Sequence, residues 1–233
     1  MNTLKLSKPK LTDFAAVLFD MDGLVLDTET TYLQAWQQAI QQMDYPCHQL
    51  QPVNLAGLSH ADVEKQLIKT FGKTFDLSVF NTLSSQCWYK IVQQQGIPIK
   101  PGFWPLLAAI LDNHIPYCLA TNSSRKNAQE CLTYAQLIGI FPHIISRDDV
   151  PLGKPEPDIF LYAAHRLNVN IKDCLILEDS WTGICAGFRA GAYVVWVSET
   201  TFQQPKHQQY CHIKLNNLNE VLETFRSSVV FRL

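Results

Sequence analysis

The sequence predicts an α/β protein with a doubly wound parallel sheet and an inserted all-helical domain. Two observations lead to this fold class. Short apolar runs alternate with helical patterns over most of the chain. One long stretch contains helical patterns without any strand signal and interrupts this alternation. Strands that alternate with helices form parallel βαβ units, with helices on both faces of a buried sheet. A chain of 233 residues, 47% of them hydrophobic, is long enough for one large core or two smaller ones.

Five apolar runs are too short to form helices and are expected to be the strands. They are residues 15–19, 116–120, 143–145, 174–177 and 193–197. Apolar residues recur at helical spacing between several of them. These helical segments are residues 103–111, 128–135 and 159–167. The expected core is therefore a Rossmann-like sheet formed by residues 1–28 and 99–233.

Residues 29–98 lack a strand signal and contain three successive helical patterns. The first has apolar residues from Tyr32 to Met43. The second begins at a capping-box sequence, residues 59–62, and the third follows Ser78 as a predicted N-cap and stops before Gly96. We therefore expect residues 29–98 to form a helical cap domain inserted after the first strand.

The bulk composition limits the class of partner. A net charge of −2 and the lack of any Lys/Arg run argue against nucleic acid, so a small molecule is the expected partner. The N-terminus lacks the pattern of a cleaved signal, and no segment has eighteen uninterrupted apolar residues, so we expect a cytoplasmic protein with no membrane partner. Seven scattered cysteines without a C-x-x-C pair are read as reduced packing residues. The oligomeric state stays open, and a monomer is compatible with the sequence.

Polar segments stand at four of the expected strand or helix ends. They are Asp20–Gly23, Thr121–Ser124, Gly153–Pro155 and Glu178–Ser180. In open α/β sheets, ligands bind beyond the carboxyl ends of the strands. The sequence therefore predicts that these segments meet at one rim of the sheet, although about 160 residues separate the first from the last.

The residue types in these segments suit a metal ion and a phosphate group. Four of them are carboxylates, the oxygen donors that suit Mg²⁺. These predicted metal ligands are Asp20, Asp22, Glu178 and Asp179. A hydroxyl, an amide and an ammonium group would bind a phosphate, whose charge the ammonium and the metal neutralise together. These predicted phosphate-binding residues are Thr121, Asn122 and Lys154.

The two aspartates of the first segment are expected to have different tasks. If the chain turns at Gly23, Asp20 can face the phosphorus as the nucleophile, while Asp22 lies near the leaving oxygen as the general acid and base. An aspartyl-phosphate intermediate then divides one difficult displacement into two steps.

Each segment also has a purely structural interpretation. Asp22 and Gly23 could form a turn, Thr121–Ser124 and Glu178–Ser180 could cap the helices that follow, and Lys154 could be a solvated surface lysine. These interpretations do not predict that all four segments fall at the ends of regular elements in this order. Taken together, the segments favour a catalytic site.

Four stretches carry a family resemblance. VLFDMDGLVLDTE, TNSS, GKPEPDIF and LEDSWTGICAGFRAGA together resemble the haloacid dehalogenase-like hydrolase superfamily, in its branch with a helical cap after the first strand. That branch includes beta-phosphoglucomutase and sugar-phosphate phosphatases. The resemblance implies that Asp20 is the nucleophile, Asp22 the acid/base, and Thr121 and Lys154 ligands of the transferring phosphate. It also implies that Mg²⁺ is surrounded by carboxylates and one main-chain carbonyl. These are Asp20, Asp179, Glu178 and the carbonyl of Asp22.

The resemblance leaves alternatives within and outside the branch. Dehalogenases proper lack the second aspartate, so Asp22 argues against dehalogenation. A phosphosugar mutase has an arginine where this chain has His60 and a histidine near Tyr32, and both departures weaken that alternative. A receiver-type signalling module would lack Asp22 and the insertion at 29–98. The expected protein is a magnesium-dependent phosphatase of a small phosphorylated metabolite, such as a sugar phosphate.

Overall fold

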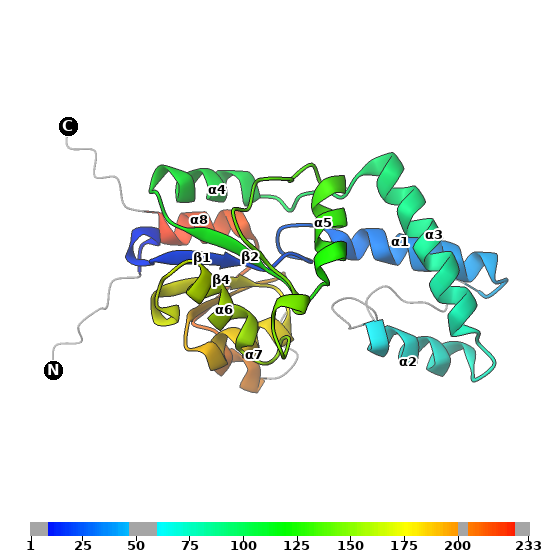
Figure 1. Ribbon diagram of the computed structural model, residues 1–233. Helices are drawn as coiled ribbons and strands as arrows, with labels where there is room; N and C mark the ends of the chain where they lie inside the picture. Colours follow the sequence, from blue (N-terminus) through cyan, green and yellow to red (C-terminus); the bar gives the residue numbers. More distant parts are fainter. Residues whose placement is uncertain (1–8, 47–59, 200–204, 227–233) are drawn as a thin grey trace.

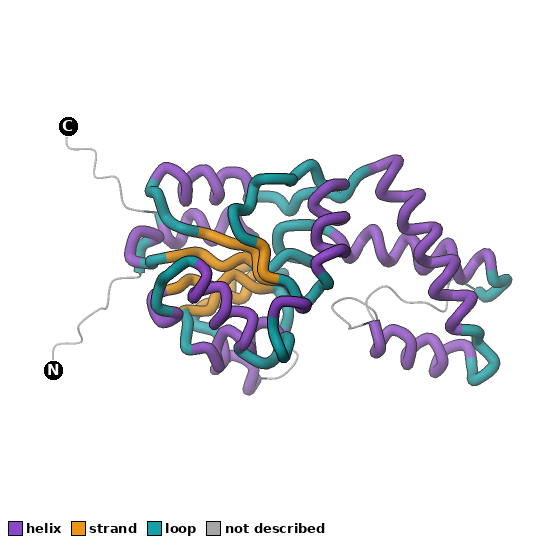
Figure 2. Tube along the Cα trace, viewed as in Figure 1, coloured by secondary structure: helices purple, strands orange, loops and turns teal. Residues whose placement is uncertain are grey.

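The computed structural model describes residues 9–46, 60–199 and 205–226, in which helices enclose one parallel sheet (Figures 1 and 2). The strands are β1 (Ala16–Phe19), β2 (Tyr117–Ala120), β3 (Ile144–Ile145), β4 (Cys174–Glu178), β5 (Tyr193–Val197) and β6 (Ile213–Leu215). The helices are α1 (Thr28–Gln42), α2 (His60–Phe71), α3 (Leu77–Gln95), α4 (Phe103–Asp112), α5 (Arg125–Tyr134), α6 (Asp158–Arg166), α7 (Trp181–Ala190) and α8 (Leu218–Phe225). Short 3₁₀ turns are at Leu11–Asp13, Arg147–Asp149, Ile171–Asp173 and Pro205–Tyr210.

The strands lie in the order β3-β2-β1-β4-β5-β6, and all neighbours are parallel. The chain therefore winds outward from β1 in both directions, and the direction changes between β1 and β4. Ligands bind in the crevice at such a switch point, outside the carboxyl ends of the strands. The predicted doubly wound, Rossmann-like core is confirmed.

Alternate residues of each strand supply two apolar faces. On β1, Ala16 and Leu18 pack with α6 and α7, whereas Val17 and Phe19 pack with α4, α5 and α8. All four residues are fully buried, as expected for a central strand of a sheet that helices cover on both sides. Among the described residues, no helix is both long and apolar enough to span a bilayer.

Two details of the chain differ from the prediction. The edge strand β6 was missed, because Ile213–Leu215 is only three residues long and has a lysine at its centre. The N-cap of α3 is Asp76, not the predicted Ser78: the Asp76 carboxylate accepts hydrogen bonds from the main-chain N–H groups of Ser78 (2.9 Å) and Val79 (3.0 Å). A carboxylate at a helix N-terminus satisfies these amides and favours the helix dipole. The capping residue predicted for α2, Ser59, lies outside the described residues.

Helices α1, α2 and α3 extend together beyond one end of the sheet (Figure 1). Residues of all three helices, with Phe75 from a connecting loop, form a separate small core made of Ala39, Ile40, Val63, Leu67, Phe75 and Phe80. The two chain segments that join this extension to the sheet pair side by side. Asp27 N–H donates to Pro98 (2.8 Å), and Lys100 N–H donates to Val25 (2.9 Å). The division into a cap at 29–98 and a core at 1–28 and 99–233 stays a prediction.

Candidate active site

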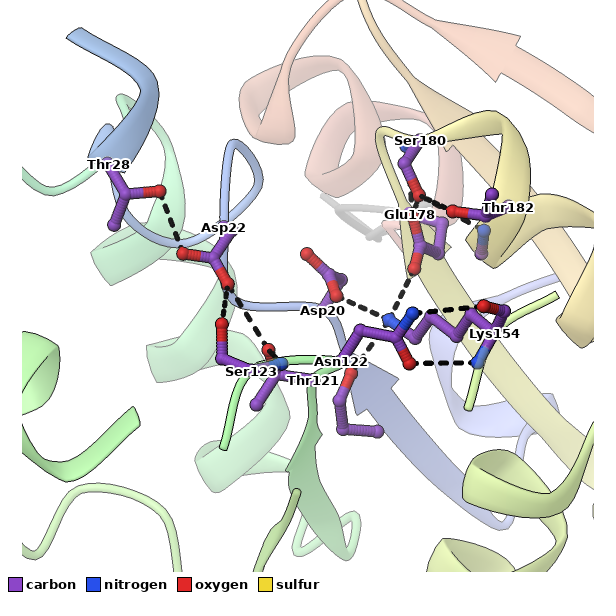
Figure 3. A network of polar contacts seen from close by, with 12 residues as sticks. Asp20, Asp22, Thr28, Thr121, Asn122, Ser123, Lys154, Glu178, Ser180 and Thr182 are labelled. Atoms are coloured by element: carbon purple, nitrogen blue, oxygen red, sulfur yellow. Dashed lines mark hydrogen bonds and ion pairs between the residues drawn. The ribbon is translucent and has the colours of Figure 1, made fainter. Parts of the chain in front are cut away.

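The structure brings the four polar segments together at the carboxyl ends of β1, β2 and β4 (Figure 3). Asp20 follows β1 directly, and its N–H donates to the carbonyl of Leu177 on β4 (3.1 Å). Thr121 follows β2, and Glu178 is the last residue of β4. These residues lie around the switch point between β1 and β4, where the topology favours a ligand.

Lys154 is the centre of a buried ionic network. Its side chain is 2% exposed, which excludes the interpretation as a solvated surface lysine. The ammonium binds Asp20 Oδ1, Glu178 Oε1 (2.5 Å) and the carbonyl oxygen of Ala120 (2.9 Å). Burial alone would lower the pKa of this lysine, but the charges of Asp20 and Glu178 outweigh burial and raise it. The two carboxylates therefore favour the charged form of Lys154 beside Asp20.

Glu178 is fixed by contacts on both of its oxygens. Oε1 accepts from Lys154, and Oε2 accepts from the N–H and the hydroxyl of Ser180, each at 2.9 Å. Ser180 is also the N-cap of α7, where its hydroxyl accepts from Gly183 N–H (3.0 Å). A Cβ on Gly183 would come within 1.7 Å of Glu178 Oε1, so only glycine leaves room for this carboxylate. The helix-cap interpretation of this segment is thus correct, and it positions a site residue as well.

Asp179 has an oxygen without a hydrogen-bond donor. Its Oδ1 is buried and accepts no hydrogen bond from any residue that the structure describes. Gly23, with φ 81°, lies against the same carboxylate: a Cβ there would be 2.0 Å from Asp179 Oδ2. The main chain of Asp179 is held by Trp196, whose indole N–H donates to the Asp179 carbonyl (2.9 Å). A buried carboxylate oxygen of this kind requires a hydrogen-bond donor or a cation as its partner.

Three carboxylates form a group that fits a hard cation. Single oxygens of Asp20, Glu178 and Asp179 lie within 4.8 Å of one another. Burial raises the pKa of both Asp20 and Asp179 well above the usual range, and the neighbouring carboxylates raise it further, against the effect of Lys154. One ammonium therefore does not neutralise the group. An all-oxygen donor set with an unpartnered oxygen suits Mg²⁺.

The Asp22 side chain has different surroundings. It points away from Lys154, toward three hydroxyl groups (Figure 3). Thr28 donates to Oδ1 at 2.8 Å, while Ser123 and Thr121 donate to Oδ2 at 2.9 and 3.2 Å. The Asp22 carboxylate is not part of the three-carboxylate group, so its predicted metal contact rests on its main-chain carbonyl.

The partners Thr28 and Ser123 were not singled out from the sequence. Both lie inside the stretches that carry the family resemblance, but the residue types gave no sign of which hydroxyl would reach Asp22. The neighbouring Ser124 caps α5, since its hydroxyl accepts from Asn127 N–H (3.3 Å). The cap interpretation of this segment is therefore correct for one of its residues.

Asn122 has an unexpected contact. Its side-chain oxygen accepts from the N–H of Lys154 (2.8 Å), and its side-chain NH₂ donates to the carbonyl of the same residue (3.0 Å). The side chain thus holds the loop that carries Lys154. Phosphate binding by Asn122 stays a prediction.

Comparison with known proteins identifies the family. A model of the haloacid dehalogenase-like hydrolases matches residues 17–197. The chain belongs to this family. A Drosophila melanogaster protein named as a probable pseudouridine-5'-phosphatase is 32% identical over 81% of this chain and 84% of that protein. The beta-phosphoglucomutase of Bacillus subtilis is 31% identical over 79% of this chain and 83% of the mutase.

Solved structures agree with this family fold. A haloacid dehalogenase family hydrolase from Deinococcus radiodurans, crystallised with bound phosphate and sodium, superposes with a TM-score of 0.74 at 23% identity. The match covers 91% of this chain and 97% of the hydrolase. The family predicted from the four sequence stretches is confirmed, and so is the prediction that the chain is an enzyme, since its family is one of hydrolases with relatives named as phosphatases.

Proposed function

We propose that this haloacid dehalogenase-like hydrolase is a Mg²⁺-dependent phosphatase of small phosphorylated metabolites, sugar phosphates first among them, in the cytoplasm. One observation carries the proposal: two aspartates two residues apart have opposite surroundings, with Asp20 beside a buried ammonium and Asp22 among neutral hydroxyls. A carboxylate fixed beside a cation suits attack on a phosphate, and one held by exchangeable hydroxyl donors suits proton transfer. The relatives named as a probable pseudouridine-5'-phosphatase and a beta-phosphoglucomutase support a small phosphorylated substrate.

The first step forms the aspartyl-phosphate. Lys154 binds Oδ1 of Asp20, and the second carboxylate oxygen points away from the lysine, free to attack (Figure 3). This oxygen forms a bond to phosphorus while the bond between phosphorus and the leaving oxygen breaks. Asp22 gives its proton to that leaving oxygen, so the alcohol departs neutral. The Lys154 ammonium offsets charge on the phosphoryl oxygens.

The second step releases inorganic phosphate. Asp22, now a carboxylate, takes a proton from water, and the water oxygen bonds to phosphorus as the bond to Asp20 breaks. This returns both aspartates to their starting states. The Thr121 hydroxyl, which lies at 3.2 Å from Asp22 Oδ2, is close enough to the reacting groups to contact the phosphate. Thr121 accordingly keeps its predicted role as a phosphate ligand.

The residues that would hold Mg²⁺ are Asp20, Asp179 and the Asp22 main-chain carbonyl, with Glu178 beside them. The unpartnered oxygen of Asp179 supports this assignment. When bound, the ion supplies positive charge that neutralises phosphate oxygens and lets two anions approach each other. Both carboxylate oxygens of Glu178 accept hydrogen bonds, one from Lys154 and the other from Ser180. This supports a role for Glu178 in positioning Lys154 within the three-carboxylate group.

A phosphosugar mutase is the second candidate, because the Bacillus subtilis relative at 31% identity is named as one. A mutase has to retain a bisphosphate through two transfers, which requires a cation in the cap to grip the second phosphate. The sequence has His60 and Tyr32 where the mutase resemblance expects an arginine and a histidine. The side chain of His60 lies outside the described residues. A receiver-type module receives no support, because the chain belongs to a family of hydrolases.

A screen of phosphorylated metabolites with Mg²⁺ tests the proposal. We expect inorganic phosphate to be released from sugar monophosphates without any added bisphosphate, and Asp20→Asn to serve as the inactive control. Interconversion of 1- and 6-phosphosugars faster than phosphate release would replace the phosphatase with the mutase. Absence of turnover on every phosphate monoester would contradict both.

A further inference from the structure

We infer that Asn122 is a positioning residue for Lys154: its side-chain amide fixes the main chain from which the catalytic ammonium extends. This inference rests on the proposed phosphatase function, and it gives the Asn122 side chain a different task from the phosphate contact predicted from the sequence. It concerns how the cation is placed, since Asn122 itself need not touch the substrate.

The contact is a two-point clamp on a single residue. Asn122 Oδ1 accepts from Lys154 N–H at 2.8 Å, and Nδ2 donates to Lys154 C=O at 3.0 Å. One amide side chain therefore satisfies both main-chain polar groups of Lys154. Two hydrogen bonds to the same residue fix its orientation as well as its position. The clamp joins the loop after β2 to a loop 32 residues further along the chain.

The packing around Gly153 shows that the loop is pressed against this amide. A Cβ on Gly153 would lie 2.5 Å from Asn122 Oδ1 and 2.5 Å from Arg147 Cδ. Arg147 holds the preceding part of the loop, because its guanidinium donates to the carbonyls of Val150 (2.8 Å) and Pro151 (3.1 Å). The loop from 150 to 154 is thus held at both ends, and the glycine before Lys154 makes the close approach possible.

The position of the Lys154 main chain matters because its ammonium has no freedom to adapt. The ammonium is buried and contacts Asp20, Glu178 and the Ala120 carbonyl, so a displaced main chain would pull it from at least one of these partners. A misplacement of about 1 Å in a catalytic group can cost about 100-fold in rate. Loss of the clamp should therefore slow the phosphoryl transfer more than it weakens substrate binding.

Steady-state kinetics of Asn122→Ala, Asn122→Asp and a matched control test the inference. We expect Asn122→Ala to lower kcat about 10- to 100-fold and to raise KM by a smaller factor, about threefold or more. Asn122→Asp keeps the acceptor for Lys154 N–H and loses the donor, so its kcat should fall between wild type and Asn122→Ala. The control is Asn217→Ala, which removes an amide that accepts from Glu220 N–H at the start of α8 (3.1 Å). This control should lower the melting temperature and leave kcat unchanged.

A double-mutant cycle shows whether Asn122 acts through Lys154. The readout is the Kd for inorganic phosphate with saturating MgCl₂, measured by calorimetry on wild type, Asn122→Ala, Lys154→Ala and the double variant. If Asn122 acts through the lysine, its substitution should weaken phosphate binding in the wild type and change Kd less than twofold once Lys154 is absent. Equal effects in both backgrounds would overturn the inference.

Hydrogen exchange separates this inference from the proposed function. In Asn122→Ala, the peptide covering residues 150–156 should exchange at least 10-fold faster at the Lys154 amide, while Asn217→Ala leaves it unchanged. Unchanged exchange would overturn the clamp, whatever the enzyme hydrolyses. Faster exchange in Asn122→Ala, together with a wild-type chain that releases no phosphate from any monoester, would support the clamp and contradict the proposed function.

Discussion

Asp20 and Asp22 are two residues apart, and the structure holds them in contrasting ways. Asp20 is 6% exposed and bound to an ammonium that Glu178 shares. Asp22 is partly exposed, and within the described part of the chain its carboxylate accepts hydrogen bonds from hydroxyl groups alone, those of Thr28, Thr121 and Ser123. The difference follows from the turn at the end of β1, because the first aspartate faces the β4 side and the second faces the β2 loop and the start of α1.

The contrast shows how one short segment can carry two kinds of chemistry. A buried cluster with fixed charges resists movement, since each of its charged groups is costly to leave unpaired. Hydroxyl groups are weaker partners that can rotate, so they can hold Asp22 with or without its proton. The following predictions test each side of this comparison, beginning with the largest expected effect.

Substitution of Asp20 tests the nucleophile directly. We expect Asp20→Asn to lower kcat at least about 1,000-fold, the scale expected when a covalent nucleophile is lost. The measurement is phosphate release from the best substrate of the metabolite screen. Circular dichroism should show an intact fold, since the two side chains have nearly the same shape. Near-normal turnover in the folded variant would end the mechanism.

Removal of the metal ion tests the three-carboxylate group. We expect EDTA to lower turnover by at least about 100-fold, and Mg²⁺ but not Ca²⁺ to restore it, because Ca²⁺ takes more oxygen ligands at longer distances and can bind both oxygens of Asp20. Mg²⁺ should also raise the melting temperature of the wild type, as it offsets the repulsion between buried carboxylates. Asp179→Asn should reduce that shift. Equal saturating rates with the two metals would show that the nucleophile is not a ligand.

Two glycines of α7 provide a matched test of the Asp20 side. Gly183→Ala would place a Cβ at 1.7 Å from Glu178 Oε1 and displace this carboxylate from Lys154. Gly187→Ala would place one at 2.9 Å from a methyl group of Val194, and its nearest neighbours are methyl groups of Val194 and Ile176. Both variants should unfold at lower temperature, but only Gly183→Ala should lose activity, by about 10- to 100-fold. Equal activity losses would mean that strain in the helix matters rather than the position of Glu178.

The strands and the residues that meet at this site could be predicted from the sequence better than the contacts between their side chains. Apolar runs and the polar residues that follow them are local signals, so β1, β2, β4 and the convergence of Asp20, Thr121, Lys154 and Glu178 could be predicted. The sheet topology then follows from the alternation of strands and helices. Short elements without a clear apolar run, such as β6, leave no comparable signal.

Contacts between side chains from distant segments could not be predicted in the same way. The Asn122 amide has the chemistry to bind phosphate, but only the folded chain shows its two hydrogen bonds to the Lys154 main chain. Asp76 and Ser78 are both good helix caps, so the sequence alone gives no choice between them. From the sequence, Gly23 is expected to allow a turn and Gly183 is not singled out, whereas the structure shows that each leaves room for a carboxylate.

Adjacent serines test the Asp22 side with the smallest expected effect. Ser123 donates to Asp22 Oδ2 at 2.9 Å, while Ser124 caps α5. Ser123→Ala removes one of three hydroxyl donors, and a hydrogen bond to a charged group is worth about 1.5 to 3 kcal/mol, of which Thr28 and Thr121 should recover a part. We expect kcat to fall about 3- to 10-fold with KM nearly unchanged, because Asp22 is less well oriented for proton transfer. Ser124→Ala should lower the free energy of unfolding by about 1 kcal/mol through loss of the cap and leave kcat unchanged. If Ser124→Ala slowed turnover as much as Ser123→Ala, the loop as a whole, rather than the hydroxyl on Asp22, would set the rate.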